Sequence, residues 1–126
     1  HACPMWVPLV ENGEYASDGA DFFVKKEIDA LLSENPNIDA LLLGCTHYPL
    51  LLPKIRKHLP LHINIIQQGH IVAESLKKYL THHSDVELSL KKQSSVLFYT
   101  TDSCDSFNAI GSTFMQESIF SHNIQL

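Results

Sequence analysis

Long apolar runs are absent from the 126-residue sequence. No stretch approaches the roughly 18 to 20 residues that a helix needs to cross a bilayer, and no secretory signal pattern is present. We therefore expect a soluble protein of the cytoplasm, with no membrane partner. The sequence begins at His1, without a methionine or a leading strand signal, and from this we expect a fragment of a longer protein.

Positive charge is also scarce. Nine Lys and Arg residues stand against 14 Asp and Glu residues, which gives a net charge of −5 and a pI near 5.8. The lysine pairs at 77–78 and 91–92 are isolated and do not form a clustered basic face. We expect no nucleic acid or anionic membrane as a partner, because both are bound by such faces.

Cysteine is limited to three widely spaced residues, Cys3, Cys45 and Cys104. Such an odd, scattered set does not form a disulfide framework and indicates a reducing compartment. No Cys-x-x-Cys pair, no paired histidine spacing and no lysine in a setting typical of pyridoxal phosphate is found, so we expect neither a metal nor a cofactor. A zinc-binding module stays open as an alternative, because the sequence has eight histidines. Its ligands would come from Cys45, His47, His58, His62, His70, His82 and His83.

The most informative stretch runs from residue 38 to residue 59. The apolar run 38–43 predicts a short strand buried on both faces, and Gly44 ends it. Cys45, Thr46 and His47 follow at once. Tyr48-Pro49 then opens a segment with helical apolar spacing, in which a proline near the first turn costs little.

A thiol between the carboxyl end of a strand and the amino end of a helix lies where open α/β sheets bind ligands. The partial positive charge of the helix end favours the thiolate form of Cys45. The alternative is a small core cysteine, since buried cysteines commonly play no chemical role.

Helical and strand patterns alternate through the rest of the chain. Residues 17–19 provide capping chemistry for a helix over 24–32. Further helices are predicted at 72–80 and 107–114, and further strands at 61–66 and 96–101. Alternation at this spacing predicts an α/β fold with a parallel sheet and right-handed crossovers.

Three segments lack such patterns. Residues 2–10 are apolar but contain Pro4 and Pro8, which cannot donate within a sheet, and a packed loop or irregular edge is expected there. Residues 81–95 are polar and predict a connector, and 116–126 show no clear pattern.

The motif Gly44-Cys-Thr-His-Tyr-Pro49 resembles the second active-site cysteine motif of the glutamate racemases, which need no cofactor. The segment Ala2-Cys-Pro-Met-Trp-Val-Pro-Leu-Val-Glu11 is similar to the segment that precedes this cysteine in the family. The resemblance runs to about Met115. It implies that Cys45, His47 and Glu11 are catalytic residues, with Glu11 rather than Glu14 as the acid. It also implies that Cys3 is a structural core cysteine.

Several expectations follow from this resemblance. The fold would be the parallel-sheet lobe of a two-lobe racemase. Residues 1–70 would form the lobe that bears Cys45, and 71–126 would be a helix-strand-helix segment that returns to the first lobe. The amino-terminal half, with its own cysteine, would be missing. Gln67-Gln68 departs from the family pattern, which puts any polar contact there in doubt.

The implied reaction is the interconversion of L- and D-glutamate, which supplies D-glutamate for peptidoglycan and so for bacterial cell shape. Such an inversion needs a base on one face of the α-carbon and an acid on the other. Thr46 and Gly44 would bind the substrate. A fragment with one of two thiols is expected to be inactive alone. The oligomeric state stays open, with a homodimer as one alternative.

Other activities remain as alternatives. The aspartate and hydantoin racemases share the two-cysteine plan, although the histidine after Cys-Thr favours the glutamate branch. A Cys–His nucleophile for acyl transfer would use His47 as its base, but no orienting acid is evident. A non-catalytic α/β binding domain could retain the motif as packing.

Overall fold

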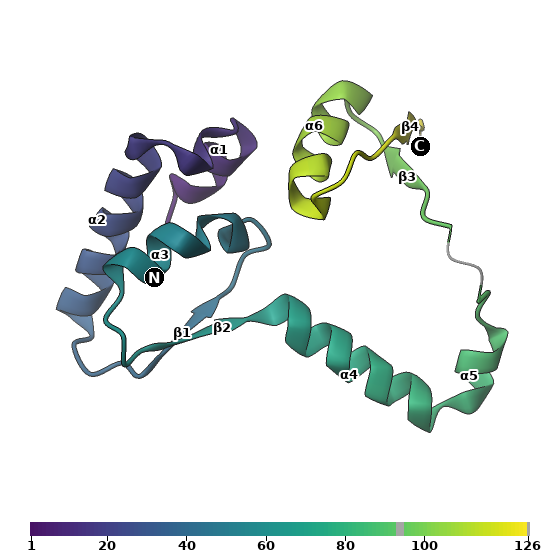
Figure 1. Cartoon of the computed structure of the whole chain (residues 1–126), viewed down its shortest axis with the longest axis horizontal. Coiled ribbons are helices and arrows are strands. Elements are labelled where there is room, and N and C mark those ends of the chain that lie inside the picture. Colours follow the sequence, from purple (N-terminus) through teal and green to yellow (C-terminus); the bar gives the residue numbers. More distant parts are fainter. Residues whose placement is uncertain (93–94, 126) are drawn as a thin grey trace. The chain divides into compact units, whose positions relative to one another are not determined.

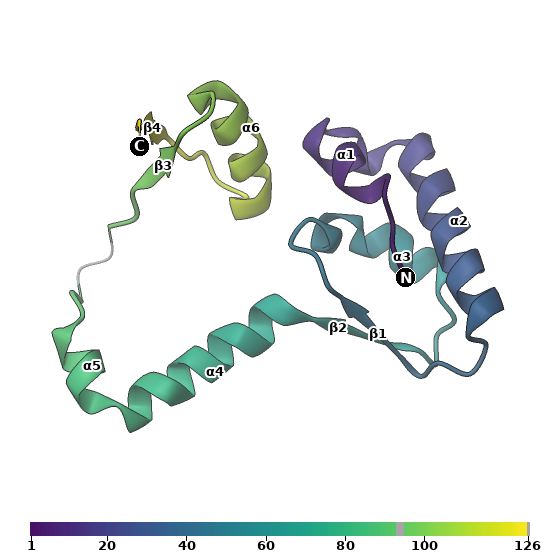
Figure 2. The same ribbon diagram turned by 180° about the vertical axis from the view of Figure 1, so that it is seen from behind.

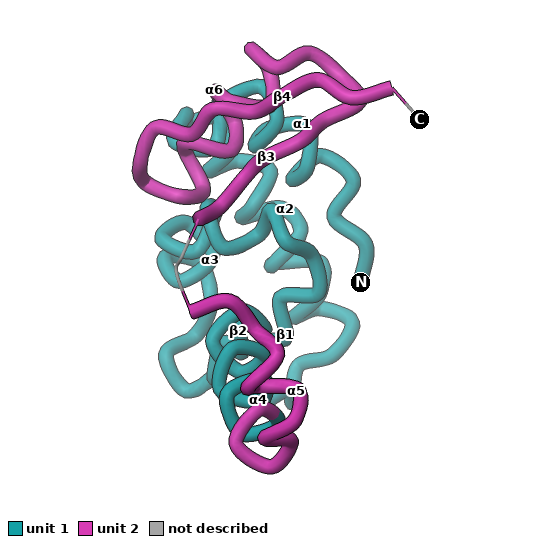
Figure 3. The backbone as a smooth tube through the Cα atoms, turned by 90° about the vertical axis from the view of Figure 1, so that its right-hand side faces the viewer, with its two compact units in different colours: residues 1–79 teal, residues 80–126 magenta. Residues whose placement is uncertain are grey.

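The computed structural model describes residues 1–92 and 95–125. The chain forms two compact units, residues 1–79 and residues 80–126 (Figure 3). The division at residue 70, and the return of 71–126 to another lobe of a larger enzyme, stay predictions.

Figure 1 shows helices separated by four short strands in the part of the chain that the structure describes. The first unit contains α1 (Trp6–Glu11), the 3-10 turn η1 (Glu14–Ala16), α2 (Asp18–Glu34), β1 (Ala40–Leu43), the 3-10 turn η2 (Tyr48–Leu51), α3 (Leu52–His58), β2 (Asn64–Gln67) and most of α4 (Gln68–His82). The second contains α5 (Ser84–Ser89), β3 (Phe98–Thr100), α6 (Cys104–Met115) and β4 (Ser121–Asn123).

Strands β1 and β2 lie side by side and run parallel (Figures 1 and 2). Their register pairs Ala40 with Asn64 and Leu43 with Gln67. The segment η2–α3 crosses from the end of β1 to the start of β2, because parallel neighbours cannot be joined by a tight hairpin. The predicted α/β class with parallel strands is confirmed.

Helix α2 anchors the first unit. The side chain of Ser17 caps it by accepting a hydrogen bond from the backbone N–H of Ala20 at 3.1 Å, as the sequence predicts. Val24 and Ile28 are buried on the face that packs toward α3, where Ile55 is also buried. Each such aliphatic side chain contributes about 1.5–3 kcal/mol when fully buried.

The expectation of a loop over residues 2–10 is wrong, because Trp6–Glu11 forms α1. Pro8 is the third residue of this helix, and a backbone N–H in the first turn has no partner within the helix, so proline removes nothing there. Trp6 and Val10 are buried and fix α1 to the core. Glu11 is thereby held at the end of α1.

The prediction that residues 38–43 are buried on both faces is also wrong. Leu43 is 4% exposed, whereas Leu42 is 57% exposed, and its register partner Ile66 is exposed as well. Side chains alternate along a strand, and within the first unit the helices cover only the face of Leu43.

Smaller differences concern where elements begin. The helix predicted from Tyr48 starts as a 3-10 turn and becomes α-helical at Leu52. The strand predicted at 61–66 is Asn64–Gln67, and Leu61 lies in the preceding turn, 91% exposed.

In the second unit, the connector predicted at 81–95 contains α5, and its residues Gln93 and Ser94 lie outside the described residues. Helix α6 is confirmed, with Ser103 accepting a hydrogen bond from the N–H of Ser106 at 3.4 Å. The patternless segment 116–126 contains β4, which pairs in parallel with β3.

Candidate active site

Cys45, Thr46 and His47 lie in the loop between β1 and η2. Two backbone hydrogen bonds tighten it, from Tyr48 N–H to Cys45 C=O at 3.3 Å and from Leu50 N–H to His47 C=O at 3.2 Å. The loop leaves the carboxyl end of a parallel strand, the edge at which α/β sheets bind ligands.

Three of the predicted site residues form a connected chain. The Cys45 Sγ lies 3.6 Å from His47 Nδ1, and the opposite ring nitrogen of His47, Nε2, contacts the carboxylate of Glu11. Glu11 is 36 residues earlier in the sequence and comes from α1. The side chain of His47 is 23% exposed and that of Glu11 41%, so solvent reaches the far end of the chain.

This geometry can hold a thiol and an imidazole in a defined relation. A carboxylate on one ring nitrogen orients the imidazole, so that its other nitrogen faces the Cys45 sulfur. The sequence-based expectation that no acid orients His47 in a Cys–His pair is therefore wrong, because the Glu11 carboxylate contacts the His47 ring.

Thr46 and Gly44 are the predicted substrate-binding residues. The Thr46 hydroxyl lies 3.5 Å from His47 Nδ1, so it competes with the Cys45 sulfur for one nitrogen. A Cβ added at Gly44 would meet no atom within 4 Å, and its φ is not positive. Within this chain neither packing nor backbone conformation requires glycine there, and its role stays a prediction.

Sequence reasoning missed Tyr48, although it directly follows His47. Its ring packs edge-on against Trp6, with centroids 4.8 Å apart. Burial, followed by the nearby Cys3 and Cys45, raises the pKa of its hydroxyl. Tyr48 therefore joins the Cys45 loop to the segment that carries Cys3.

Cys3 is half-buried and hydrogen-bonded to Tyr48. Burial, reinforced by the charge of Glu27, raises the pKa of its thiol to about 11. At neutral pH Cys3 is protonated, in contrast to what a catalytic thiolate needs.

The histidines of the zinc alternative are not gathered into a metal site in the part of the chain that the structure describes. His58 is bonded to Asp21 at 3.0 Å, and His47 to Glu11. Across the described ranges, the one group of three closely spaced metal-ligating side chains is His1, Cys3 and Glu27. In the same ranges no helix combines the length and the apolar character of a membrane span.

The chain is similar to curated glutamate racemases over most of its length. It is 38% identical over 116 residues to the enzyme of Carnobacterium sp. This match covers 91% of this chain and 42% of the relative. It is 33% identical over 118 residues to the enzyme of Streptococcus uberis. This match covers 94% of this chain and 44% of the relative. No protein-family profile matches the chain.

Comparison with solved structures also finds glutamate racemases. A glutamate racemase isoform from Bacillus anthracis superposes with a TM-score of 0.87 at 32% identity, covering all of this chain and 46% of that one. The chain is therefore similar in sequence and in fold to part of the glutamate racemases. The enzyme from Francisella tularensis, solved with D-glutamate, gives a TM-score of 0.81 at 26% identity.

The chain spans a little under half the length of the glutamate racemases that it matches. This partial coverage agrees with the prediction that it corresponds to the carboxyl-terminal half of such an enzyme.

Proposed function

We propose that this chain supplies one side of the active site of a cofactor-independent glutamate racemase. The observation that carries the proposal is the chain of contacts from Cys45 through His47 to Glu11, in a segment homologous to glutamate racemases. The complete enzyme would interconvert L- and D-glutamate in the bacterial cytoplasm and supply D-glutamate for peptidoglycan.

Cys45 would exchange a proton with one face of the substrate α-carbon. In one direction its thiolate takes the α-proton: the C–H bond breaks, the S–H bond forms, and the electron pair spreads into the α-carboxylate. A thiol on the opposite face then returns a proton to the carbon. In the other direction the two thiols exchange roles, which is why one thiol does not suffice.

His47 and Glu11 would keep Cys45 ready for this step. His47 would face the Cys45 sulfur with one ring nitrogen during the proton transfer, and the Glu11 carboxylate would hold the ring in place at the other. Thr46 and the backbone N–H groups around Gly44 would hold a substrate carboxylate and stabilise the charge that develops during proton transfer.

The partner of this half-site would be the remaining half of a racemase, with the second thiol. The exposed apolar side chains of the sheet face and of α4, namely Leu42, Ile66, Ile71, Val72 and Leu76, are available to such a half. Enclosure would also exclude water, which strengthens each electrostatic contact in the cleft.

Acyl transfer is the second candidate, because Glu11 completes a Cys–His–acid arrangement. A p-nitrophenyl ester discriminates between the two. Turnover of the ester by the chain alone, lost in Cys45→Ser, would favour acyl transfer, whereas the racemase proposal predicts no turnover.

Reconstitution tests the proposal. The chain is mixed with the separately produced amino-terminal half of a related glutamate racemase, and formation of D-glutamate from L-glutamate is measured, with L-aspartate as the competing substrate. We expect activity on glutamate that Cys45→Ser abolishes and Cys104→Ser retains. Equal activity of the Cys45→Ser mixture would overturn the role of Cys45, and preference for aspartate would overturn the substrate.

A further inference from the structure

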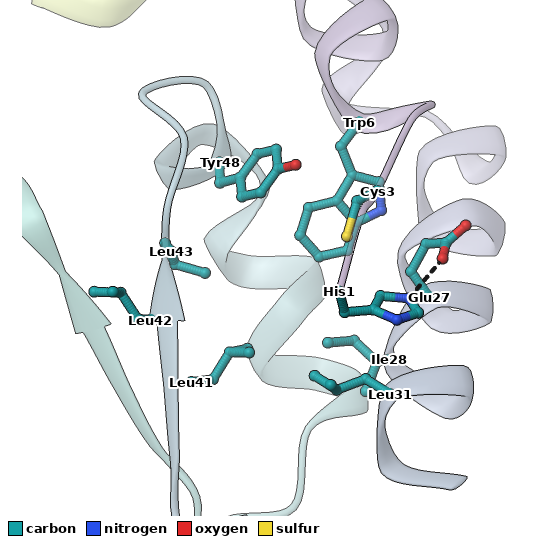
Figure 4. Close-up of a pocket in the computed structure, with 10 residues that line it drawn as sticks. All are labelled: His1, Cys3, Trp6, Glu27, Ile28, Leu31, Leu41, Leu42, Leu43 and Tyr48. Carbon is teal, nitrogen blue, oxygen red and sulfur yellow. Dashed lines mark hydrogen bonds and ion pairs between the residues drawn. The ribbon is translucent and has the colours of Figure 1, made fainter. Parts of the chain in front are cut away.

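A second cluster of reactive side chains lies in a small pocket of the first unit (Figure 4). The pocket has a volume of about 120 Å³ and is bordered by apolar side chains of α2 and β1. His1, Cys3 and Glu27 line one side of it, and their ligating atoms all lie within 4.8 Å of one another. None of the three belongs to the chain of contacts formed by Cys45, His47 and Glu11.

The donor types fit a borderline-soft divalent cation. Zinc binds cysteine sulfur, histidine nitrogen and carboxylate oxygen at about 2.0–2.3 Å, so tetrahedral ligand atoms lie roughly 3.3–3.7 Å apart. The imidazole Nε2 of His1 lies 2.9 Å from a Glu27 oxygen, and one ligating atom from each of the three residues lies within 4.8 Å of the other two. Side-chain shifts of about 1 Å would place all three on one ion.

The surroundings of His1 supply a second, independent observation. Its Nε2 faces Glu27, while its other ring nitrogen, Nδ1, lies 3.6 Å from a Glu34 oxygen. A carboxylate hydrogen-bonded to the second nitrogen is the usual support of a metal-bound histidine, and a small shift of the exposed Glu34 side chain would close this distance to a hydrogen bond.

The charge of the cluster also favours a cation. The Glu27 side chain is only 11% exposed, and a carboxylate so placed is costly unless it is paired. A bound cation would compensate this carboxylate together with the His1 ring, which lies 2.9 Å from it.

We propose that His1, Cys3 and Glu27 form a binding site for a zinc-class divalent cation, with its fourth position open to the pocket. Binding breaks the Cys3 S–H bond, releases that proton to solvent and forms a metal–thiolate bond. A water molecule fits the fourth position, because the pocket volume of about 120 Å³ exceeds the roughly 30 Å³ that one water occupies.

Cobalt(II) provides a spectroscopic probe. The untagged, metal-free chain is titrated with Co²⁺ while the thiolate-to-cobalt charge-transfer band and the visible bands of four-coordinate cobalt are recorded, and Zn²⁺ is then added as a competitor. We expect both bands to appear at one equivalent and to vanish with Zn²⁺. A titration without a thiolate band would overturn the proposal.

The double variant Cys45→Ser/Cys104→Ser identifies the sulfur without altering the pocket. It leaves Cys3 as the only thiol, so the band should persist with an affinity within about twofold of the parent chain. Loss of the band would assign the metal to Cys45 or Cys104 and overturn the site.

The ligand variants complete the test. Glu27→Gln and His1→Ala should each weaken Zn²⁺ binding by at least about tenfold, with Glu14→Gln and His62→Ala as matched surface controls. Because one thiol proton is released, affinity should rise about tenfold per pH unit between pH 7 and 8. Unchanged affinity in the ligand variants, or no dependence on pH, would contradict the site.

Discussion

At the residue scale, the two cysteines of the first unit have different charged neighbours. Cys45 lies beside an imidazole that a carboxylate contacts, whereas Cys3 lies beside a buried carboxylate. A cationic neighbour stabilises a thiolate and an anionic neighbour destabilises one. Cys3 is thereby kept protonated, whereas the proposed role of Cys45 in proton transfer rests on its position beside His47.

Alkylation should reveal this difference. With a pKa of about 11, Cys3 carries a thiolate in only roughly one molecule in three thousand at pH 7.5. We expect iodoacetamide to modify Cys45 first in the native protein, as measured by peptide mass spectrometry over a pH series. Faster labelling of Cys3 or Cys104 near neutral pH would contradict the assignment of Cys45.

Glu11→Gln tests the contact with His47. The amide cannot stabilise an imidazolium as a carboxylate does, so alkylation of Cys45 at pH 7 should slow about three- to tenfold. Glu14→Gln is the matched control, since Glu14 lies three residues further on and is exposed. Equal rates in the two variants would show that Glu11 does not act on Cys45.

The sequence led to the individual site residues but not to their contacts. Cys45 and His47 lie in one short motif, which is recognisable without structure. Glu11 was selected over Glu14 by resemblance alone, because a contact across 36 residues depends on how α1 packs. The cluster of His1, Cys3 and Glu27 was missed for the same reason, since Glu27 comes from α2.

At the element scale, α2 packs against α3, the helix that follows the Cys45 loop and η2. Their apolar faces pack together, and Asp21 on α2 binds both Lys57 at 2.9 Å and His58 at 3.0 Å at the end of α3. Hydrogen bonds from Lys57 and then His58 lower the pKa of Asp21 below its ordinary value of 3.8.

This contact predicts a pH dependence. A carboxyl group whose pKa is lower in the folded state stabilises the fold above its unfolded value, and this stabilisation is lost as the pH falls below about 4. Urea midpoints between pH 2.5 and 6 should therefore fall more steeply for the parent chain than for Asp21→Asn. Parallel curves would contradict the contact, and Asp29→Asn, exposed on α2, serves as the control.

Element type followed from the sequence more readily than element ends. Apolar spacing predicted α2, α4 and α6, because each buries or presents one apolar stripe. Strand β4 has the polar sequence Ser-His-Asn and offers no such pattern, since it forms through pairing with β3. The exposure of Leu42 depends on what covers the sheet, which a local pattern does not encode.

At the scale of the whole molecule, we propose that this chain holds one side of a two-sided reaction. It spans a little under half the length of its relatives, and among its three cysteines only Cys45 lies in a strand-to-helix loop with an imidazole. We expect the chain alone to racemise no glutamate, because Cys45 reaches only one face of the α-carbon. Loss of an essential acid or base costs on the order of 10²–10⁴ in rate, and loss of enclosure adds to this.

Hydrogen exchange at the α-carbon tests this central claim most directly. L- and D-glutamate are incubated in D₂O with the chain alone, and again after the amino-terminal half of a related glutamate racemase is added. Deuterium incorporation and inversion are followed by NMR. The account predicts no inversion by the chain alone, inversion of both enantiomers on mixing, and loss of inversion with Cys45→Ala. Efficient two-way racemisation by the chain alone would contradict the division of the reaction between two thiols.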